Sequence, residues 1–433
     1  MQGDLGSYHY LNEILLSFDT FLIQKDEINA LRSDGKNWRG SEKAHDQKEL
    51  LFEPTPEEFA GAVHWAHERG FLGEGSSVLV LESISGKGPP GFPENKVKVY
   101  PHSSANWRSS EHGNQVVSRV LGIAPHSHCI VADPSETIFD NQHQNDFKSI
   151  KIVNASFAWR KNKNSDQNQE KIEKTLEFIK NRVYVHAFGN EHKELAEEES
   201  RDLGDICILP DFLSNAILVV SVDRDSSLSD FSNRPQDTAD YWHASDKQKQ
   251  KVMENTISAL GDHIVGVNSF GEVGNVSGTS FAAPTVAGAL ALVEGMGKTA
   301  GIELDALELK GVLLNSARQE AFIPKGNYEG YSDFYLPKVS YKYGQQGTMI
   351  SDALYEQVKR ESLQDKSGAN PSVFKDEVQK NGIIYKPFDP TQYGRGFLDI
   401  RRVMKLAKLY MIQKKKDLKK KGDASPQDIA KSL

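Results

Sequence analysis

The sequence has 433 residues, 38% of them hydrophobic and 26% charged, which is the composition of a globular protein able to bury a sizeable core. At about 150 residues per domain, this length predicts two or three domains, or one large domain with insertions. No apolar run reaches the roughly 18 residues that a membrane-spanning helix needs, because the best candidate, at 282–296, contains Pro284 and Glu294. The sequence therefore excludes a membrane-spanning protein.

The first residues contain an Asp but no Lys or Arg before a short apolar stretch, which is not the pattern of a secretory signal. We therefore expect a cytoplasmic protein, or one exported without a signal peptide. The two cysteines, Cys129 and Cys207, lie among apolar neighbours without metal-binding spacing, so we expect buried thiols.

Residues 1–55 are polar and mixed, apart from one helix candidate at 10–23, and we interpret them as an N-terminal extension. A helix is predicted at 60–69, where Gly70 would end it. Short runs of aliphatic and β-branched residues follow at 78–81, 128–132, 150–157, 182–188 and 216–222. They lack polar alternation, as strands buried on both faces of a parallel sheet do.

Helix-like stretches between these runs, at 116–121 and 172–179, predict an α/β fold with three layers, α/β/α, and a mainly parallel central sheet. We expect the main domain to cover 56–320. Residues 233–255 are polar and turn-rich, and 321–390 are long enough for an insertion or lid subdomain. Residues 391–433 would then close the main domain and form a basic tail.

The tail carries a marked charge asymmetry. Residues 401–433 contain eleven Lys and Arg and three Asp, a net charge of +8, whereas the whole chain has −8 and the first 400 residues therefore −16. A solvated helix, starting near 401, with a frayed end is the simpler interpretation, and a surface for anionic partners is the alternative. We expect no specific nucleic-acid binding.

The most informative stretch is NVSGTSFAAPTVAGALALV, at 275–293. Ser280 would lie in the first turn of a helix, where backbone N–H groups and the helix dipole can stabilise an oxyanion. A serine there is more often a helix cap, so its partners decide the interpretation.

A serine hydroxyl becomes a good nucleophile only beside a base that a third group orients. His112 begins the segment HGNQVVSRVLGIAP at the start of a predicted helix, and Glu82 directly follows the apolar run at 78–81. Asn190, after the run at 182–188, can direct its amide at an oxyanion. These four residues could form one catalytic site.

Six segments resemble blocks of the subtilisin-like serine proteases (subtilases), in the family's order of carboxylate, histidine and serine. They are GFLGEGSSVLVLES, HGNQVVSRVLGIAP, NASF, AFGNE, GTSFAAPTVAGALALV and YGRGFLDI. Together they cover about 68–320 and 391–402. The resemblance implies a subtilisin-like fold and a serine endopeptidase that acts on proteins or peptides.

The resemblance also implies roles for single residues. His112 would be the general base and then acid, Ser280 the nucleophile, and Asn190 an oxyanion donor beside the backbone N–H of Ser280. Glu82 would orient the histidine, although the family has Asp there. Substrate would lie along Ser156, Phe157 and Ala158 and against a pocket wall that includes Phe188 and Gly189.

Other departures concern packing and cofactors. Gln115 replaces the family's usual second histidine, and the usual folding prodomain is not evident in 1–55. No cofactor is identified. Many subtilases bind calcium, but no ligand set here matches one by residue, and we interpret Asp223, Asp225 and Asp230 as a solvated turn.

Three alternatives to an active protease stay open at this point. The Glu in place of Asp would fit a catalytically impaired subtilase that acts as a binding module. The same site could also carry out ester hydrolysis or acyl transfer, because the tetrahedral intermediate is shared. Finally, the basic tail could make the chain an interaction protein.

Overall fold

The structure is a computed structural model of the whole chain. It describes residues 62–63, 65–67, 69–82, 84, 88–89, 92–100, 107–134, 137–138, 144–157, 165–191, 204–223, 228–241, 243–270, 273–317, 321–324, 383–386 and 389–422. The predicted extension at 1–55, with its helix candidate at 10–23, lies outside the described residues. Within the predicted helix at 60–69, residues 62–63 and 65–67 are helical, and Arg69 and Gly70 form a turn in which Gly70 has a φ of 77°.

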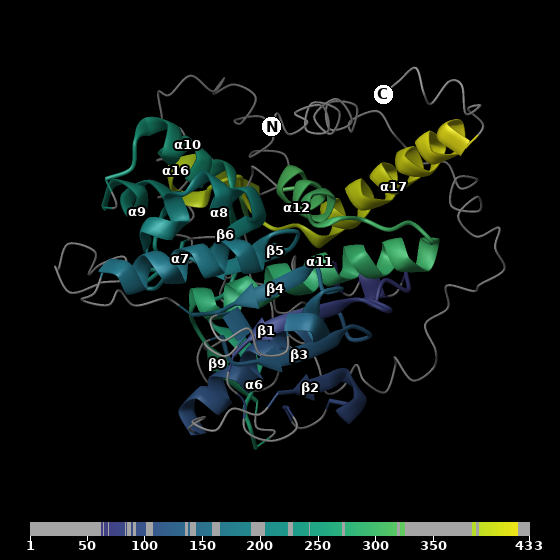
Figure 1. Cartoon of the computed structure of the whole chain (residues 1–433), viewed down its shortest axis with the longest axis horizontal. Coiled ribbons are helices and arrows are strands. Elements are labelled where there is room, and N and C mark those ends of the chain that lie inside the picture. The colour runs from purple at the N-terminus through teal and green to yellow at the C-terminus, as the bar shows by residue number, and fades with distance from the viewer. Residues whose placement is uncertain are drawn as a thin grey trace.

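A seven-stranded sheet forms the centre of the molecule, with the strand order β2-β3-β1-β4-β5-β6-β7 (Figure 1). Every strand pair in it is parallel. The strands are β1 (Ser77–Leu81), β2 (Val97–Val99), β3 (His128–Ala132), β4 (Ile152–Ala155), β5 (Val183–Ala187), β6 (Ala216–Val222) and β7 (Thr256–Leu260). The predicted fold class is confirmed, and so are all five predicted strands, although β4 ends two residues before Phe157.

Helices cover both faces of the sheet, because successive strand residues point to opposite sides. Val78 and Val80 join one core with α6 (Trp107–Ile123) and α11 (Thr279–Ala300), whereas Leu79 and Leu81 join the other core. The second core includes residues of α7 (Ser165–Ile179), α8 (Pro210–Asn215) and α10 (Asp246–Glu254). The result is the predicted three-layer arrangement.

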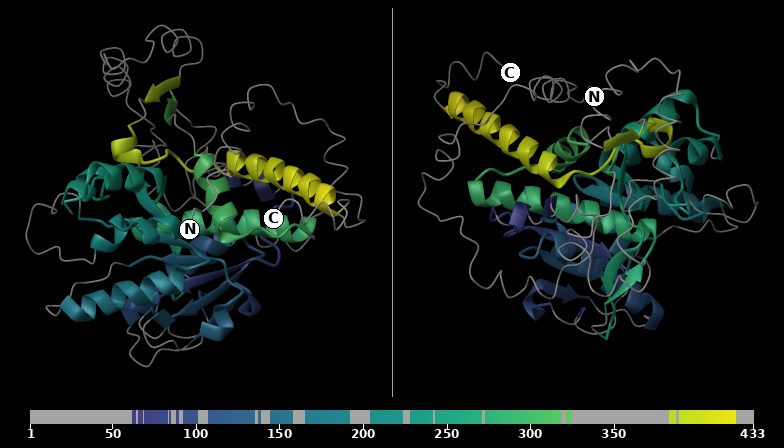
Figure 2. Two further views of the ribbon diagram at one scale, coloured as in Figure 1. Left: turned by 45° about the horizontal axis from the view of Figure 1, so that its top comes forward. Right: turned by 180° about the vertical axis from the view of Figure 1, so that it is seen from behind.

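The remaining elements lie between or beyond these layers. They are η2 (Glu94–Lys96), η4 (Gln144–Phe147), η5 (Gly204–Ile208), α9 (Pro235–Tyr241), β8 (Ile264–Val267), β9 (Val273–Val276), α12 (Ala306–Asn315), β10 (Ala321–Pro324), β11 (Ile383–Lys386), α16 (Pro390–Tyr393) and α17 (Ile400–Gly422). β8 and β9 form an antiparallel hairpin directly before α11. Figure 2 shows α17 running beside α11, which it contacts.

The prediction of a turn-rich stretch at 233–255 was wrong, since this stretch contains α9 and α10. In α10 only Val252 is buried, so the helix lacks the apolar stripe that a sequence pattern would detect. A capping box stabilises its start: the Ser245 side chain accepts from the backbone N–H of Gln248, and the Gln248 side chain accepts from the backbone N–H of Ser245. The strand β7 directly after it was also missed.

The insertion predicted at 321–390 is described only near its two ends. There β10 and β11 pair antiparallel, so that Ala321 lies opposite Lys386. The residues between these strands lie outside the described part of the chain. The two strands thus bring both ends of this segment together.

One described helix, α11, is long and apolar enough to cross a membrane, but 94% of its most apolar window is buried inside the protein. It is the central helix of the core beside α6. Both cysteines are buried and outside disulfides, as predicted, and burial raises the pKa of the Cys129 thiol.

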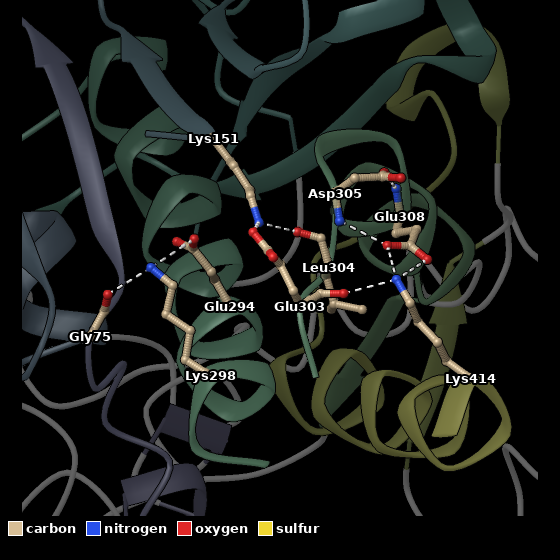
Figure 3. Close-up of polar contacts among 9 residues, drawn as sticks. All are labelled: Gly75, Lys151, Glu294, Lys298, Glu303, Leu304, Asp305, Glu308 and Lys414. Atoms are coloured by element: carbon tan, nitrogen blue, oxygen red, sulfur yellow. Dashed lines mark hydrogen bonds and ion pairs between the residues drawn. The ribbon is translucent and has the colours of Figure 1, made fainter. Parts of the chain in front are cut away.

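Charged contacts surround the C-terminal end of α11 (Figure 3). Lys298 Nζ lies 3.1 Å from Glu294 Oε1 and donates to the carbonyl of Gly75 at 2.7 Å. On α17, Lys414 donates to both carboxylate oxygens of Glu308 at 2.6 Å. At least this lysine of the basic tail therefore binds within the protein.

A third lysine near this end connects the sheet to the segment after α11. Lys151, just before β4, donates to Glu303 Oε1 at 2.8 Å and to the Leu304 carbonyl at 2.6 Å. Lys414 also donates to the carbonyl of Glu303, at 2.8 Å. We call these contacts of Lys151, Lys298 and Lys414 the lysine clamps, which fix α11, α12 and α17 to one another and to the sheet.

Candidate active site

The candidate residues lie at the carboxyl ends of parallel strands, which meet at one edge of the sheet. Glu82 follows β1, Ser156 follows β4 and Asn190 lies three residues after β5. Ser280 is the second residue of α11, whose first turn contacts residues at this edge. The topology thus brings together side chains that are far apart in the sequence.

Glu82 and His112 are in contact. Nδ1 of His112 lies 3.2 Å from Oε1 of Glu82, and the side chains are 33% and 9% exposed, respectively. The backbone N–H of Glu82 donates to the carbonyl of Ala132 at 3.0 Å, which fixes the carboxylate at the end of β1. The sequence predicted His112 at the start of a helix. Because α6 begins at Trp107, His112 lies in its second turn instead.

The environment of His112 affects its charge in two opposing ways. Burial is the largest single influence and lowers the pKa of its imidazole, but the negative charge of Glu82 and its contact with the ring together outweigh burial, so that the pKa lies above its ordinary value of 6.5. Because Nδ1 faces the carboxylate, the proton of the neutral ring belongs on Nδ1, and Nε2 keeps its lone pair. The geometry thus favours the tautomer that a general base needs.

Phe281, the residue after Ser280, contacts this histidine: its ring lies 5.4 Å from the imidazole ring, centroid to centroid. The Ser280 hydroxyl nevertheless donates to the carbonyl of Ser156, at 3.2 Å. Among the contacts of the described residues, none is a hydrogen bond between Ser280 and His112. The structure therefore pairs Glu82 with His112 and Ser280 with Ser156, and Phe281, next to Ser280 in the chain, contacts the histidine ring.

Asn190 is held in one orientation by the start of α11. Its Oδ1 accepts hydrogen bonds from the backbone N–H and the hydroxyl of Thr279, both at 2.9 Å. Because an N–H can only donate, the oxygen of the amide must face Thr279, and the NH₂ group must face away. Asn190 is exposed, and no described residue accepts a hydrogen bond from its NH₂ group.

The backbone N–H of Ser280 is also available. Gly278 precedes α11 with a φ of 154°, and its carbonyl accepts from the N–H groups of Phe281 and Ala282. The N–H of Thr279 binds Asn190, and no described group accepts from that of Ser280. The first turn of α11 thus presents a free donor beside its serine, as helix starts do.

The loop that carries Asn190 is braced by Asn233. Its Oδ1 accepts from the N–H of Glu191 at 3.0 Å, and its Nδ2 donates to Oε2 of the same residue at 2.9 Å. Gly189 between Phe188 and Asn190 has a φ of 106°, and a Cβ there would collide with Asn233 and Glu191. Only glycine fits this tight turn.

The residues predicted to bind substrate lie near this loop. Phe188 is buried at the end of β5, Gly189 and Phe157 are half-buried, and Ser156 is buried with its carbonyl facing Ser280. Ala158 lies outside the described residues. Gln115, in place of a histidine, packs against Gly266 of β8.

Sequence reasoning missed Thr279, Glu191 and Asn233. Thr279 lies in the segment GTSFAAPTVAGALALV, and its hydroxyl beside the serine could have indicated a hydrogen-bond partner in the site. Asn233 lies 43 positions after Asn190, in the stretch that we predicted as turns, so no local pattern connects the two.

Of the three carboxylates considered for calcium, the structure describes Asp223 and Asp230. Asp230 is exposed, and Asp225 lies outside the described residues. Asp223 lies instead with Asp262 and His263, with one ligand atom from each within 4.8 Å of the others. Calcium prefers oxygen ligands, so a group with an imidazole is not the set that the family's calcium sites would need.

A comparison with family profiles decides the family: the Subtilase family matches residues 93–347, more than half of the chain. The chain belongs to the subtilases. His112, Asn190 and Ser280 lie within the matched range, whereas Glu82 precedes it. The protein is thus a subtilisin-like serine protease by family.

Several solved structures have a similar fold. The structure titled "Patellamide maturation protease PatG" is 15% identical, with a TM-score of 0.50, and covers 82% of this chain and 98% of its own. "Prenylagaramide maturation protease PagA" is 18% identical, with a TM-score of 0.47, and covers 83% and 98%. A "cold adapted subtilisin-like serine proteinase" is 19% identical, with a TM-score of 0.42, and covers 58% and 84%.

At 15% identity, the likeness to the structure with a TM-score of 0.50 shows a shared fold and nothing beyond it. No curated protein matches the sequence.

Proposed function

We propose that this subtilase is a serine endopeptidase that hydrolyses peptide bonds through an acyl-enzyme. Ser280 is the nucleophile, His112 the general base and acid, Glu82 the carboxylate that orients His112, and Asn190 an oxyanion donor. The observation that carries the proposal is the contact between Glu82 and His112 at the same sheet edge as the start of α11.

Activation of the nucleophile needs one movement. In the structure the Ser280 hydroxyl donates to the Ser156 carbonyl, so rotation about its side chain must bring the proton to Nε2 of His112. That nitrogen carries the lone pair because Nδ1 faces Glu82. The carboxylate also stabilises the imidazolium that forms when the proton is transferred.

Substrate itself can drive this rotation. A peptide that lies extended beside Ser156, Phe157 and Ala158 would place a backbone N–H on the Ser156 carbonyl, as in strand addition. That N–H competes with the Ser280 hydroxyl for the same oxygen. Once displaced, the hydroxyl is free to bond to His112 beside the scissile carbonyl.

The attack transfers negative charge to the carbonyl oxygen of the substrate. The NH₂ group of Asn190, which faces away from Thr279, and the N–H of Ser280 are suited to stabilise that charge. His112 then gives its proton to the leaving amine, the C–N bond breaks, and the ester on Ser280 remains. Water attacks this ester with His112 again as the base, which restores the free hydroxyl.

Profiling the purified chain on a peptide library tests this proposal. We expect cleavage of internal peptide bonds, with new amino termini that reveal the preferred residues, and we expect Ser280→Ala and His112→Ala to lose it. Ser214→Ala is the matched control, because this exposed serine donates to the Pro210 carbonyl within α8, outside the catalytic site. A folded wild type without cleavage would instead support an impaired, peptide-binding subtilase.

A further inference from the structure

The carbonyl of Ser280 lacks its normal partner within α11. In an α-helix the N–H of residue i+4 donates to the carbonyl of residue i, so the partner would be residue 284. That residue is Pro284, which has no N–H. The nucleophile therefore lies in a first turn from which one helical hydrogen bond is missing.

A side chain from the sheet supplies the missing hydrogen bond. The hydroxyl of Ser156 donates to the Ser280 carbonyl at 2.7 Å, across 124 positions of sequence. Because a carbonyl can only accept, this hydroxyl must be the donor, and its oxygen remains free to accept from elsewhere. Asn154, at the third position of β4, donates to that oxygen from Nδ2 at 3.0 Å.

Burial protects this chain of hydrogen bonds from competition by water. Asn154 has no exposed surface and Ser156 has 3%, so water does not replace either partner. The Oδ1 of Asn154 has no hydrogen-bond partner among the described residues. The opposite amide orientation would place this oxygen beside the Ser156 hydroxyl, where it could not donate. The amide thus keeps one polar atom unsatisfied in order to orient the serine hydroxyl.

We propose that the Ser156 side chain is a positioning residue, which holds the nucleophile in place through the Ser280 carbonyl that Pro284 leaves open. This role is distinct from that of the Ser156 backbone carbonyl, which accepts from the Ser280 hydroxyl and would bind substrate in the proposed function. It rests on the proposed function of Ser280. Fixing the carbonyl fixes the rotation of the first turn of α11, and with it the path of the hydroxyl to His112.

A double-mutant cycle tests the role. Ser156→Ala should lower kcat about tenfold or more and change KM less than threefold, because a small misplacement of a nucleophile slows attack more than binding. Pro284→Ala restores an N–H at the helical position and should by itself change kcat less than threefold. In the Pro284→Ala background, Ser156→Ala should then cost less than threefold in kcat.

The matched control is Ser127→Ala. Ser127 is as buried as Ser156, and its hydroxyl donates to the Ala124 carbonyl at the same 2.7 Å, but at the other edge of the sheet. It should lower the melting temperature about as much as Ser156→Ala and leave kcat unchanged. If Ser156→Ala does not fold, Asn154→Ala replaces it, with a smaller loss of kcat that Pro284→Ala again suppresses.

Equal losses of kcat from Ser156→Ala in both backgrounds would overturn the positioning role while leaving the proposed function intact. So would a Ser156→Ala variant with normal kcat. If folded wild type neither cleaves peptides nor reacts with a fluorophosphonate, the proposed function fails and this inference fails with it. These outcomes are distinguishable because wild-type activity is measured first.

Discussion

The two ends of α11 are held by different chemistry. At its start the contacts are neutral hydrogen bonds from hydroxyl, amide and backbone groups, such as Ser156 to Ser280 and Thr279 to Asn190. At its C-terminal end the contacts are the lysine clamps, in which ammonium groups meet carboxylates and carbonyls (Figure 3).

The two ends differ in whether their hydrogen-bond donors have acceptors, although Oε2 of Glu294 at the C-terminal end is itself buried without a partner among the described residues. Around the lysine clamps each of the three lysines has at least two acceptors. At the start of α11, the NH₂ group of Asn190 and the N–H of Ser280 have no acceptor among the described residues. Because Asn190 is exposed and Ser280 is half-buried, both donors are open to a bound ligand, so we infer that this end is built for substrate and the other for stability.

Removing the charge of Glu82 should lower catalytic activity more than changing any other residue of the site except Ser280 and His112. We expect Glu82→Gln to lower kcat/KM by about 10³- to 10⁴-fold, because the carboxylate orients and stabilises the imidazolium. Glu82→Asp should stay within about tenfold of wild type. If Glu82→Gln were silent, another carboxylate would have to orient His112.

The pH profile of the same variant gives the sign of the effect. His112 must be neutral to act as a base, and Glu82 holds its pKa above the ordinary value, so the acid limb of wild-type kcat/KM should lie above pH 6.5. Without the negative charge, burial lowers the pKa of His112. The acid limb of Glu82→Gln should therefore move to lower pH, and a shift to higher pH would contradict this account.

Asn190 sharpens the distinction between binding and catalysis. Asn190→Ala should lower kcat by about 10²- to 10³-fold with little change in KM, because its amide binds the oxyanion and not the ground state. Asn215→Ala is the control, since that half-buried asparagine donates to the Asp211 carbonyl in α8, outside the catalytic site. Steady-state kinetics on one peptide separates the two parameters, and a rise in KM alone would remove the oxyanion role.

Lys310 tests the stability of the region around α12. It is buried and donates to the carbonyls of Leu213 and Ser214 at the end of α8, and burial lowers its pKa to about 7. Since the unfolded chain then holds more protons between pH 7 and 10, the free energy of unfolding should rise with pH, by about 1.4 kcal/mol per unit. Denaturant unfolding of Lys310→Met should lack this contribution, and an unchanged slope would contradict the lowered pKa.

The smallest effect is expected at the lysine clamps. Lys414→Met should lower the free energy of unfolding by about 1–2 kcal/mol, because a partly buried ion pair with Glu308 is lost. Peptide cleavage at a temperature where the variant is folded should be unchanged. Lys415→Met, at the next position, is the control. A loss of activity in Lys414→Met alone would show that the C-terminal end of α11 affects catalysis at its start, and would contradict the separation of the two ends.

Much of the fold was predictable because buried strands have a simple signature. The run at 216–222 contains only one polar residue, Ser221, and it forms β6 without change. By contrast, α10 has a single buried residue and is stabilised by its cap and by contacts along its own surface, which a search for apolar periodicity does not detect.

The candidate site was predictable where a motif carries it and not where distant segments meet. Glu82, His112, Asn190 and Ser280 each lie in a recognisable block. The bond from Ser156 to the Ser280 carbonyl depends on how β4 approaches α11. A proline four residues after the serine was visible, but its consequence needs the partner that only the fold supplies.

Mapping a fluorophosphonate adduct by mass spectrometry tests the central claim most directly, since the probe reacts only with a serine that a base has activated. The account predicts one adduct, on Ser280, in wild type, none in Ser280→Ala, and a greatly slowed reaction in His112→Ala. An adduct on another serine, or labelling of Ser280 at an equal rate without His112, would contradict it.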